Sequence, residues 1–490
     1  MLSCVRKAMH KRLISNYIYN TLYQILIIFL PLLTTPYLAR VFGAEGIGSL
    51  SYVQSISSYF ILFGTLGTGL YGQREIAYYQ KKKEARSQVF LEILIIRCLM
   101  LMVSIIVYVL YLRQVQELQF LFLLQMIEII ANVFDISWYY QGMEDFRYIT
   151  FRNIAVKLIG AICIFTFIRR KADMWLYIVC LGMVGLVANL SLWLALHKTI
   201  QLSNITKLHL KRHLFPIFMV FLPQIAMQIY TLFDRTMLGY LSTYAQTGYY
   251  DQTQKIIRLI LIFITSLGTV MMPRIASIQA EDKDDKILHY LYISYKFALL
   301  LAMPAIFLLL CIANRFIPWF LGPSYDAAIS LLKWSTPLLL LIGLNNVTGM
   351  QYLISTRRQN AFTCTVVLGA VLNFIMNALL IPQFAAKGAI LSSVCAEFLI
   401  TAVQFYIVRK KIAFRKVFRE CVHYGLCAGS MFLCIIWINV LDISIILYMV
   451  LVGVMASVSY GIALYISKDT LFGNMLHFLS QKLGRCKKEV

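Results

Sequence analysis

The chain has 490 residues, of which 60% are hydrophobic and only 14% are charged. A soluble globular chain is about 45–50% apolar and about 25% charged, so this composition excludes a water-soluble enzyme built on one core. Lys and Arg number 45 against 22 for Asp and Glu, a net charge of +23. Such an excess suggests nucleic acid in a soluble protein, but the cytoplasmic loops of membrane proteins are rich in the same residues. We therefore expect a protein that contacts membrane lipids and no nucleic acid.

About fourteen apolar segments are long enough to cross a bilayer as helices. Roughly 20 helical residues span the ~30 Å hydrocarbon core. The predicted segments are 17–38, 47–70, 89–111, 118–139, 150–168, 174–196, 214–238, 249–272, 291–313, 328–352, 361–381, 387–408, 421–440 and 443–466. The linkers between them are too short to hold a soluble domain. The sequence thus predicts an all-α integral membrane protein with about 14 transmembrane helices.

Basic clusters in the linkers predict how the helices are oriented. Those that fall on one side of the predicted helices are 6–12, 81–83, 211–212, 357–358, 409–411 and 487–488. The positive-inside rule makes that side cytoplasmic, and the cluster at 169–171 is the chief exception. An even number of helices then places both termini in the cytoplasm.

An internal repeat links the two halves of the chain. The sequence Leu-Gly-Thr at 66–68 recurs at 267–269, and Arg74 recurs as Arg274 at an offset of 200 residues. Gly48 and Gly248 match at the same offset. Both copies run in the same direction, so the repeat is parallel. Parallel repeats in transporters form two lobes with the substrate site between them.

The repeat predicts three parts of the chain. Residues 1–200 form an N-lobe with helices 1–6, and residues 201–410 form a C-lobe with helices 7–12. Residues 411–490 add helices 13 and 14 and a basic cytoplasmic tail. The predicted architecture is that of a transporter with two repeat-related lobes around a central cleft.

Cations inside the apolar segments are the candidate substrate-binding residues, because a cation at mid-bilayer costs about 2.5–3.5 kcal/mol and faces a cavity or a partner. Asp251, Lys255 and Arg258 are spaced i, i+4, i+7, which predicts one face of the eighth helix. Asp251 can neutralise Lys255, and Arg can hold phosphate in a bidentate manner. The alternative is that this helix starts late and Lys255 is interfacial.

Three further arginines have two open interpretations each. Arg235 follows Asp234 near the predicted outer end of the seventh helix, and Arg74 and Arg274 lie just past helices 2 and 8. Each can reach a central cleft, or each can extend its charged end to the membrane surface. The repetition of Arg74 as Arg274 favours a role at the mouth of the cleft.

Acids within the apolar segments are candidates for coupling or for salt bridges. They are Glu128, Asp135, Asp234, Asp251 and Glu397. Glu128 and Asp135 are seven residues apart, which predicts one face of the fourth helix. Intramembrane carboxylates form proton relays or cation sites, or they pair with Arg, and the second interpretation is favoured.

Signatures of enzymes and metal sites do not occur in the sequence. It has no P-loop, no His-Glu-x-x-His and no Ser/His/Asp pattern. The 11 cysteines are scattered without metal-ligand spacing. We therefore expect no catalytic residue, no metal and no cofactor.

Several segments together resemble a known family. Residues 33–43 read LTTPYLARVFG, 71–77 read YGQREIA, 233–239 read FDRTMLG and 273–276 read PRIA. With Gly-Ile-Gly at 46–48, they resemble the polysaccharide-repeat-unit flippases of the multidrug/oligosaccharidyl-lipid/polysaccharide export superfamily. The similarity extends over nearly the whole chain and is strongest in helices 1–2 and 7–8.

The resemblance implies a function as well as a fold. Proteins of that family have twelve or fourteen helices in two lobes, and they move undecaprenyl-diphosphate-linked oligosaccharides from the inner to the outer leaflet. It implies a non-enzymatic transporter in a bacterial plasma membrane, with cleft cations that meet the diphosphate. Arg74, Arg235 and Arg274 fall on matching motifs, whereas Lys255 and Arg258 are inferred from position alone. A glycan polymerase and glycosyltransferases of the same pathway are the expected partners.

Three alternatives remain open. A multidrug antiporter of the same superfamily exports organic cations, which a cavity rich in Lys and Arg does not favour. A lipid II flippase shares the expected architecture. A membrane glycan polymerase is less favoured, because it would need a larger loop that carries catalytic residues.

Overall fold

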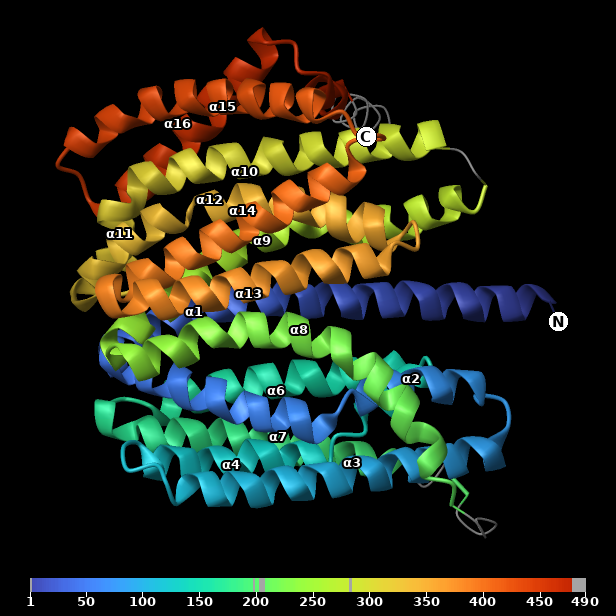
Figure 1. Ribbon diagram of the computed structural model, residues 1–490. Helices are drawn as coiled ribbons and strands as arrows, with labels where there is room; N and C mark the ends of the chain where they lie inside the picture. The colour runs from blue at the N-terminus through green and yellow to red at the C-terminus, as the bar shows by residue number, and fades with distance from the viewer. Residues whose placement is uncertain (1, 197–198, 202–207, 282–283, 478–490) are drawn as a thin grey trace. The chain divides into compact units, whose positions relative to one another are not determined.

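The computed structural model describes residues 2–196, 199–201, 208–281 and 284–477. The described residues are almost entirely helical, as the apolar segments predict (Figure 1). They form two compact units, residues 1–248 and 249–490. The repeat boundaries at residues 200 and 410 stay a prediction, because compactness does not test a repeat.

The N-terminal unit is a bundle of membrane-length helices. Its elements are α1 (Leu2–Thr65), α2 (Thr68–Tyr78), α3 (Lys83–Leu112), α4 (Gln119–Val133), α5 (Ser137–Gly142), α6 (Phe146–Phe167), α7 (Met174–Leu196) and α8 (Lys211–Leu241). The second half of α1 packs against α3, α4, α6 and α8. Its core includes Phe90 stacked on Trp138, with ring centroids 5.3 Å apart.

The C-terminal unit contains the remaining helices. They are α9 (Tyr244–Gln279), which starts just before the unit boundary, α10 (Asp284–Phe320), α11 (Asp326–Ser335), α12 (Pro337–Asn345), the π-helix η3 (Asn346–Ile354), α13 (Gln359–Phe384), α14 (Ala386–Val408), α15 (Phe414–Ile436) and α16 (Ile445–Ile466). The helices α13 and α14 pack closely side by side, as do α10 and α15.

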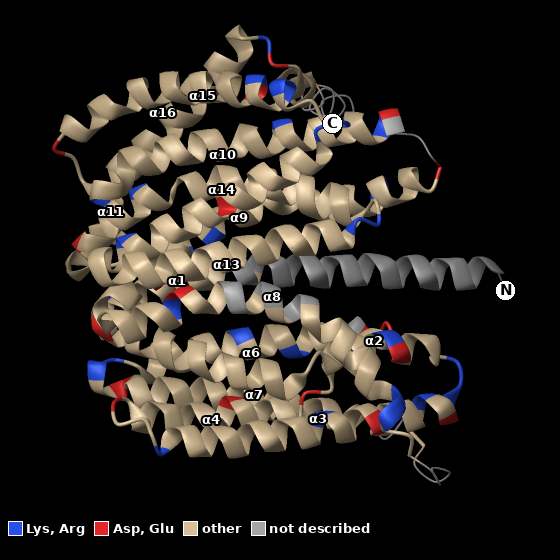
Figure 2. Cartoon of the chain, viewed as in Figure 1, with Lys and Arg blue, Asp and Glu red and all other residues tan. Residues whose placement is uncertain are grey.

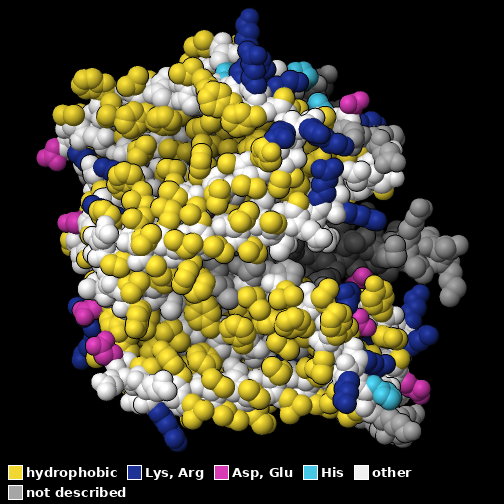
Figure 3. All heavy atoms as spheres, viewed as in Figure 1, with side chains coloured by type: hydrophobic (Ala, Val, Ile, Leu, Met, Phe, Trp, Pro, Cys, Tyr) yellow, Lys and Arg dark blue, Asp and Glu magenta, His cyan; other side chains and the backbone are white. Residues whose placement is uncertain are grey.

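Eleven described helical stretches are long and apolar enough to cross a membrane. The three other predicted segments, 17–38, 47–70 and 214–238, lie on α1 and α8. The all-α membrane fold is therefore confirmed, and eleven of the fourteen predicted spans match membrane-length helices among the described residues. Figure 3 shows hydrophobic side chains over the lateral surface of the helices and charged side chains near their ends, which is how lipid-facing helices are built.

Several helix boundaries differ from the prediction, and the segment 328–352, for example, is divided into α11, α12 and η3. The segment 47–70 is interrupted where Leu66 and Gly67 take positive φ angles of 44° and 71°, so α1 ends and α2 begins. A Cβ at Gly67 would lie 3.2 Å from Phe221 of α8, so close packing also requires a small residue here. The segment 118–139 is likewise divided into α4 and α5.

A close approach of two backbones joins α1 to the start of α9. A Cβ on Gly48 would lie 1.6 Å from the carbonyl oxygen of Tyr244, and one on Gly248 would lie 1.9 Å from that of Ala44. Any side chain would overlap these atoms. The two glycines matched by the sequence repeat thus lie at one contact.

The basic clusters used to predict orientation are described only in part. Clusters at 81–83, 211–212, 357–358 and 409–411 lie at helix ends (Figure 2). The side chains at 6–12 and the residues 487–488 lie outside what the structure describes.

Candidate functional site

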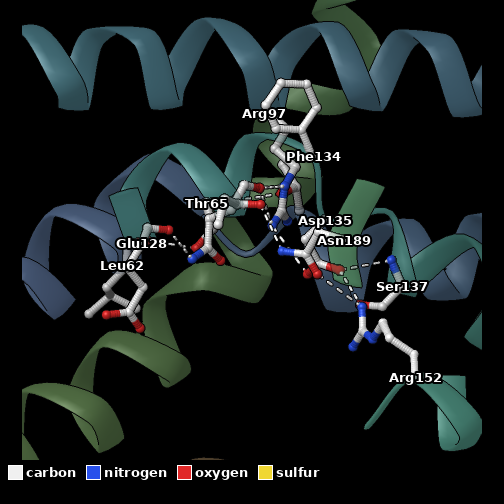
Figure 4. A network of polar contacts seen from close by, with 12 residues as sticks. Leu62, Thr65, Arg97, Glu128, Phe134, Asp135, Ser137, Arg152 and Asn189 are labelled. Atoms are coloured by element: carbon white, nitrogen blue, oxygen red, sulfur yellow. Dashed lines mark hydrogen bonds and ion pairs between the residues drawn. The ribbon is translucent and has the colours of Figure 1, made fainter. Parts of the chain in front are cut away.

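An ion-pair network lies inside the N-terminal unit, among its membrane-spanning helices (Figure 4). Arg97 of α3, only 4% exposed, pairs with Asp135 at 3.5 Å. Its guanidinium also donates to the carbonyl oxygen of Asn132 at 3.1 and 3.2 Å and to the Thr68 hydroxyl at 3.2 Å. A buried cation needs such partners, and here they come from three segments of the chain.

A second arginine completes the network from the other side. Arg152 of α6 pairs with the other carboxylate oxygen of Asp135 at 3.4 Å. It also donates to the side-chain oxygens of Asn189 at 3.1 Å and Asn153 at 2.9 Å. Asp135 therefore joins two cations, and the backbone N–H of Ser137 donates to it at 3.0 Å.

The prediction that Glu128 and Asp135 share one helix face is wrong. The helix α4 ends at Val133, and Asp135 lies in the turn before α5. The turn aims Asp135 at the two arginines, as Figure 4 shows. Glu128 remains on α4, one helix turn away from the carboxyl end.

Glu128 lines a polar cavity of about 310 Å³ within this unit. The other polar side chains of its wall are Gln54, Gln125, Asn132, Arg152, Asn153, Tyr177 and Asn189. The Gln125 amide donates to the Glu128 carboxylate. The cavity thus brings one carboxylate and one guanidinium together with several amides, at a depth where lipid would otherwise surround the helices.

The two repeated arginines have similar surroundings. Arg74 lies 5.3 Å from the ring centre of Tyr71 and 3.5 Å from Glu75. Arg274 lies 4.9 Å from the ring centre of Tyr290 and donates to its hydroxyl at 2.7 Å. Both arginines are exposed, and each lines a shallow pocket. Each is thus placed to meet an anion at a helix end.

The charged face predicted on the eighth transmembrane segment is present on α9. Lys255 pairs with Asp251 at 2.8 Å across one helical turn, which confirms the predicted pair. Asp251 is buried, whereas Lys255 is partly exposed and Arg258 is exposed. The outer part of this face is therefore positive.

Three other predicted residues lie on α8 and α14. Asp234 is buried and Arg235 is half-buried on α8. The next residue, Thr236, is 3.0 Å from the Ser55 hydroxyl of α1, so α8 is fixed against α1 here. Glu397 of α14 accepts a hydrogen bond from Asn345 at 3.1 Å.

Sequence reasoning missed a second buried cluster. Glu92 of α3 accepts hydrogen bonds from Arg212 at 2.6 Å and from the backbone N–H of His209 at 2.7 Å, and it lies 2.7 Å from His213. The other His213 nitrogen is 2.7 Å from the Tyr71 hydroxyl. Burial raises the pKa of Tyr71 to about 12, so this hydroxyl keeps its proton. The partners are about 120 residues apart, and no local pattern could have linked them.

The chain has relatives among known protein families and solved structures. A family model described as "Polysaccharide biosynthesis protein" matches residues 13–279, more than half of the chain. The chain belongs to this family. The resemblance predicted from the sequence motifs is thereby confirmed.

Relatives of this polysaccharide biosynthesis protein include bacterial proteins named as transporters. An Escherichia coli (strain K12) protein named "Putative O-antigen transporter" is 23% identical over 406 residues, which cover 80% of this chain and 96% of the relative. A Shigella dysenteriae protein of the same name is 19% identical over 384 residues, or 77% of this chain and 96% of the relative.

Solved structures share the fold. "Lipid II flippase MurJ, inward closed conformation" aligns with a TM-score of 0.75 at 15% identity, over 91% of this chain and 98% of that chain. An inward-facing multidrug resistance MATE family transporter of the MOP superfamily aligns with a TM-score of 0.61 at 14% identity, over 80% and 94%. At these identities the likeness is one of fold. The polysaccharide biosynthesis protein described here is a multi-pass membrane protein with this transporter fold.

Proposed function

We propose that the protein is a flippase that moves undecaprenyl-diphosphate-linked oligosaccharide repeat units from the inner to the outer leaflet of a bacterial plasma membrane. Family membership, the transporter fold and relatives named as O-antigen transporters support this proposal. The observation that carries it is the exposed Arg258 in a membrane-spanning helix.

Arg258 lies well inside a membrane-length helix. It is the fifteenth residue of the 36-residue helix α9, roughly 21 Å from the start of that helix. A cation in lipid at such depth costs about 2.5–3.5 kcal/mol. The Arg258 side chain is nevertheless exposed, and a guanidinium matches phosphate geometry, so this residue is suited to contact an anionic substrate.

The remaining cations extend this binding role. In the proposal, Lys255 binds the substrate beside Arg258, and Arg235 binds it from α8. Arg74 and Arg274 meet the diphosphate at the mouth of a central cleft. Both termini face the cytoplasm, where the substrate is loaded. Alternating access then exposes the cleft outward while the prenyl chain stays in lipid. A glycan polymerase and glycosyltransferases of the same pathway would supply and consume the substrate.

Among the candidate acids, Glu128 suits coupling best. Asp135 and Asp251 are held in ion pairs, whereas Glu397, like Glu128, is bonded to a neutral amide. Glu128 faces a polar cavity and is bonded to the neutral amide of Gln125, so it can gain or lose a proton without breaking an ion pair. We propose that its protonation couples an ion gradient to transport.

The test is leaflet transfer of a lipid-diphosphate oligosaccharide in reconstituted vesicles. Arg258→Ala and Arg235→Ala should each reduce transfer about 10–100-fold, because a hydrogen bond to a charged group contributes about 1.5–3 kcal/mol. Arg258→Lys should keep part of the activity. Lys387→Ala, an exposed change at the start of α14, serves as the control and should leave transfer unchanged.

Other outcomes identify the alternatives. Transfer of lipid II in preference to the oligosaccharide lipid would replace the proposal with a lipid II flippase. Export of a cationic dye, with no lipid transfer by the wild type, would indicate a multidrug antiporter. Full activity of both Arg→Ala variants would refute the cationic binding role.

A further inference from the structure

A dense basic surface lies where α14 turns into α15. We call it the α15 basic surface. Its six cations are Arg409, Lys410, Lys411, Arg415, Lys416 and Arg419. All six side chains are exposed, within eleven residues of sequence. Figure 2 marks Lys and Arg positions on the ribbon at this end of the helices, and Figure 3 shows Lys and Arg side chains there.

The turn that carries these cations is well anchored. Ile412 and Val417 are buried and hold it against the unit. The backbone N–H of Ala413 donates to the Tyr292 hydroxyl of α10 at 3.1 Å. The Lys416 ammonium lies 5.4 Å from the centre of the same tyrosine ring. The cations are therefore presented from a defined scaffold.

Exposed aromatic rings lie among the cations. Phe414 and Phe418 are 57% and 56% exposed, and their rings stack with centroids 5.9 Å apart. Arg409 lies 3.8 Å from the ring centre of the exposed Tyr406. Rings next to cations at the end of a membrane helix are suited to the interface, where the ring enters the acyl boundary and the charge meets headgroups.

Acidic residues are sparse in this stretch of the sequence. Glu420 is the one acid between residues 405 and 425 of the sequence. It lies 3.5 Å from Lys296 of α10 and 3.9 Å from Arg419. Lys296 also pairs with this acid, so Glu420 does not add an unbalanced negative charge to the surface.

We propose that the α15 basic surface binds the anionic headgroups of membrane phospholipids. Clusters of four to eight cations beside a membrane helix attract anionic lipids, at about 1 kcal/mol per cation. The exposed phenylalanines favour a lipid over an acidic soluble protein, because only a bilayer offers anions and an apolar phase at the same level. The site is separate from the transport residues, and it does not depend on the identity of the substrate.

The chain supplies a matched control. Lys81, Lys82 and Lys83 also lie exposed at the start of a membrane helix, α3. The first turn of α3 contains Glu84 and has no exposed phenylalanine pair. If net charge alone attracts lipid, the two clusters should behave alike.

The experiment measures phosphatidylglycerol binding to the purified full-length protein by native mass spectrometry, with phosphatidylcholine as the neutral probe. The triple variant Arg415→Gln/Lys416→Gln/Arg419→Gln removes three charges. Its affinity for phosphatidylglycerol should fall about 100-fold, because each cation contributes roughly a fivefold increase in affinity. Lys81→Gln/Lys82→Gln/Lys83→Gln should change it less than threefold. Phosphatidylcholine binding should change in neither variant. Thermal unfolding of each variant verifies that it is folded.

Three results would overturn the proposal. Equal losses in the two triple variants would show an effect of net charge alone. No loss in the α15 variant would exclude the surface as a lipid site. Excess soluble polyaspartate should leave phosphatidylglycerol binding undiminished. Displacement of the lipid by polyaspartate would indicate an acidic protein partner instead. Phe414→Ser/Phe418→Ser keeps every charge and should still weaken binding several-fold.

Discussion

Replacement of Asp135 by Asn tests the ion-pair network most directly. The change keeps the size of the side chain and its acceptor for Ser137, and it removes one charge. Arg97, with 4% of its side chain exposed, then keeps its bonds to a carbonyl and a hydroxyl but loses its counter-ion. Breaking a buried pair costs about 3–5 kcal/mol. Asp135 is 24% exposed, so we expect the lower end, about 3 kcal/mol.

The assay is the free energy of unfolding in mixed micelles, followed by tryptophan fluorescence, for Asp135→Asn, Arg97→Met and the double variant. Arg97→Met leaves Asp135 with its second partner Arg152, so this single change should cost less than Asp135→Asn. In the double variant Arg97 is gone, and Arg152 lacks the carboxylate but keeps its bonds to Asn153 and Asn189. The double variant should therefore be about 1–3 kcal/mol more stable than the sum of the single effects predicts.

An exposed pair supplies the control. Arg74 and Glu75 are 3.5 Å apart with half of the arginine exposed, so Glu75→Gln should cost no more than about 1 kcal/mol. The reasoning fails if Asp135→Asn is no more destabilising than Glu75→Gln. It also fails if the Arg97 and Asp135 effects add within about 0.5 kcal/mol, because contacting charges should couple.

Three other changes test the packing and the coupling. Gly248→Ala should lower the stability of the protein in thermal unfolding by about 1–3 kcal/mol, because its Cβ would overlap a backbone carbonyl. The control is Gly453→Ala, whose Cβ would meet no atom within 4 Å, so this variant should be neutral or stabilising. Glu92→Gln should lower the unfolding free energy by about 3 kcal/mol, because His213 and its neighbours lose a buried carboxylate, and amide exchange should rise at the start of α8. Glu128→Gln should abolish the dependence of lipid transfer on a pH gradient while the protein stays folded; an unchanged dependence would exclude Glu128 from coupling.

The existence of the helices could be predicted because the signal is local. A run of about 20 apolar residues must be helical in a bilayer, since no other structure satisfies its backbone there. The interruptions at 66–67 and 134–136 could not be predicted in the same way. They depend on the packing of Phe221 and on the arginines that meet Asp135.

The same distinction applies to the candidate site. The pair Asp251–Lys255 was predictable, because both residues lie one turn apart on one helix. The network of Arg97, Asp135 and Arg152 joins residues up to 55 positions apart, and a single sequence has no signal for such a contact. A charged residue within an apolar segment was the one available signal, and that signal does not reveal which partner the residue contacts.

The two copies of the Leu-Gly-Thr repeat show how far sequence similarity fixes structure. In the first copy, Gly67 has a positive φ and a short helix, α2, follows with Arg74 on it. In the second copy, Gly268 lies inside the continuous helix α9, where its Cβ position is 2.7 Å from the Asn346 side chain.

The neighbours of each glycine account for the difference. Gly67 lies against the backbone of α8, whereas Gly268 lies against polar side chains of the π-helix. Arg274 therefore lies on the same helix as Arg258, whereas Arg74 is joined to α1 through a bend. The repeat predicts where the two arginines lie, but tertiary packing decides how each is held, so the two arginines need not contribute equally to transport. Arg74→Ala and Arg274→Ala should consequently reduce lipid transfer to different extents, and equal losses would contradict this reasoning.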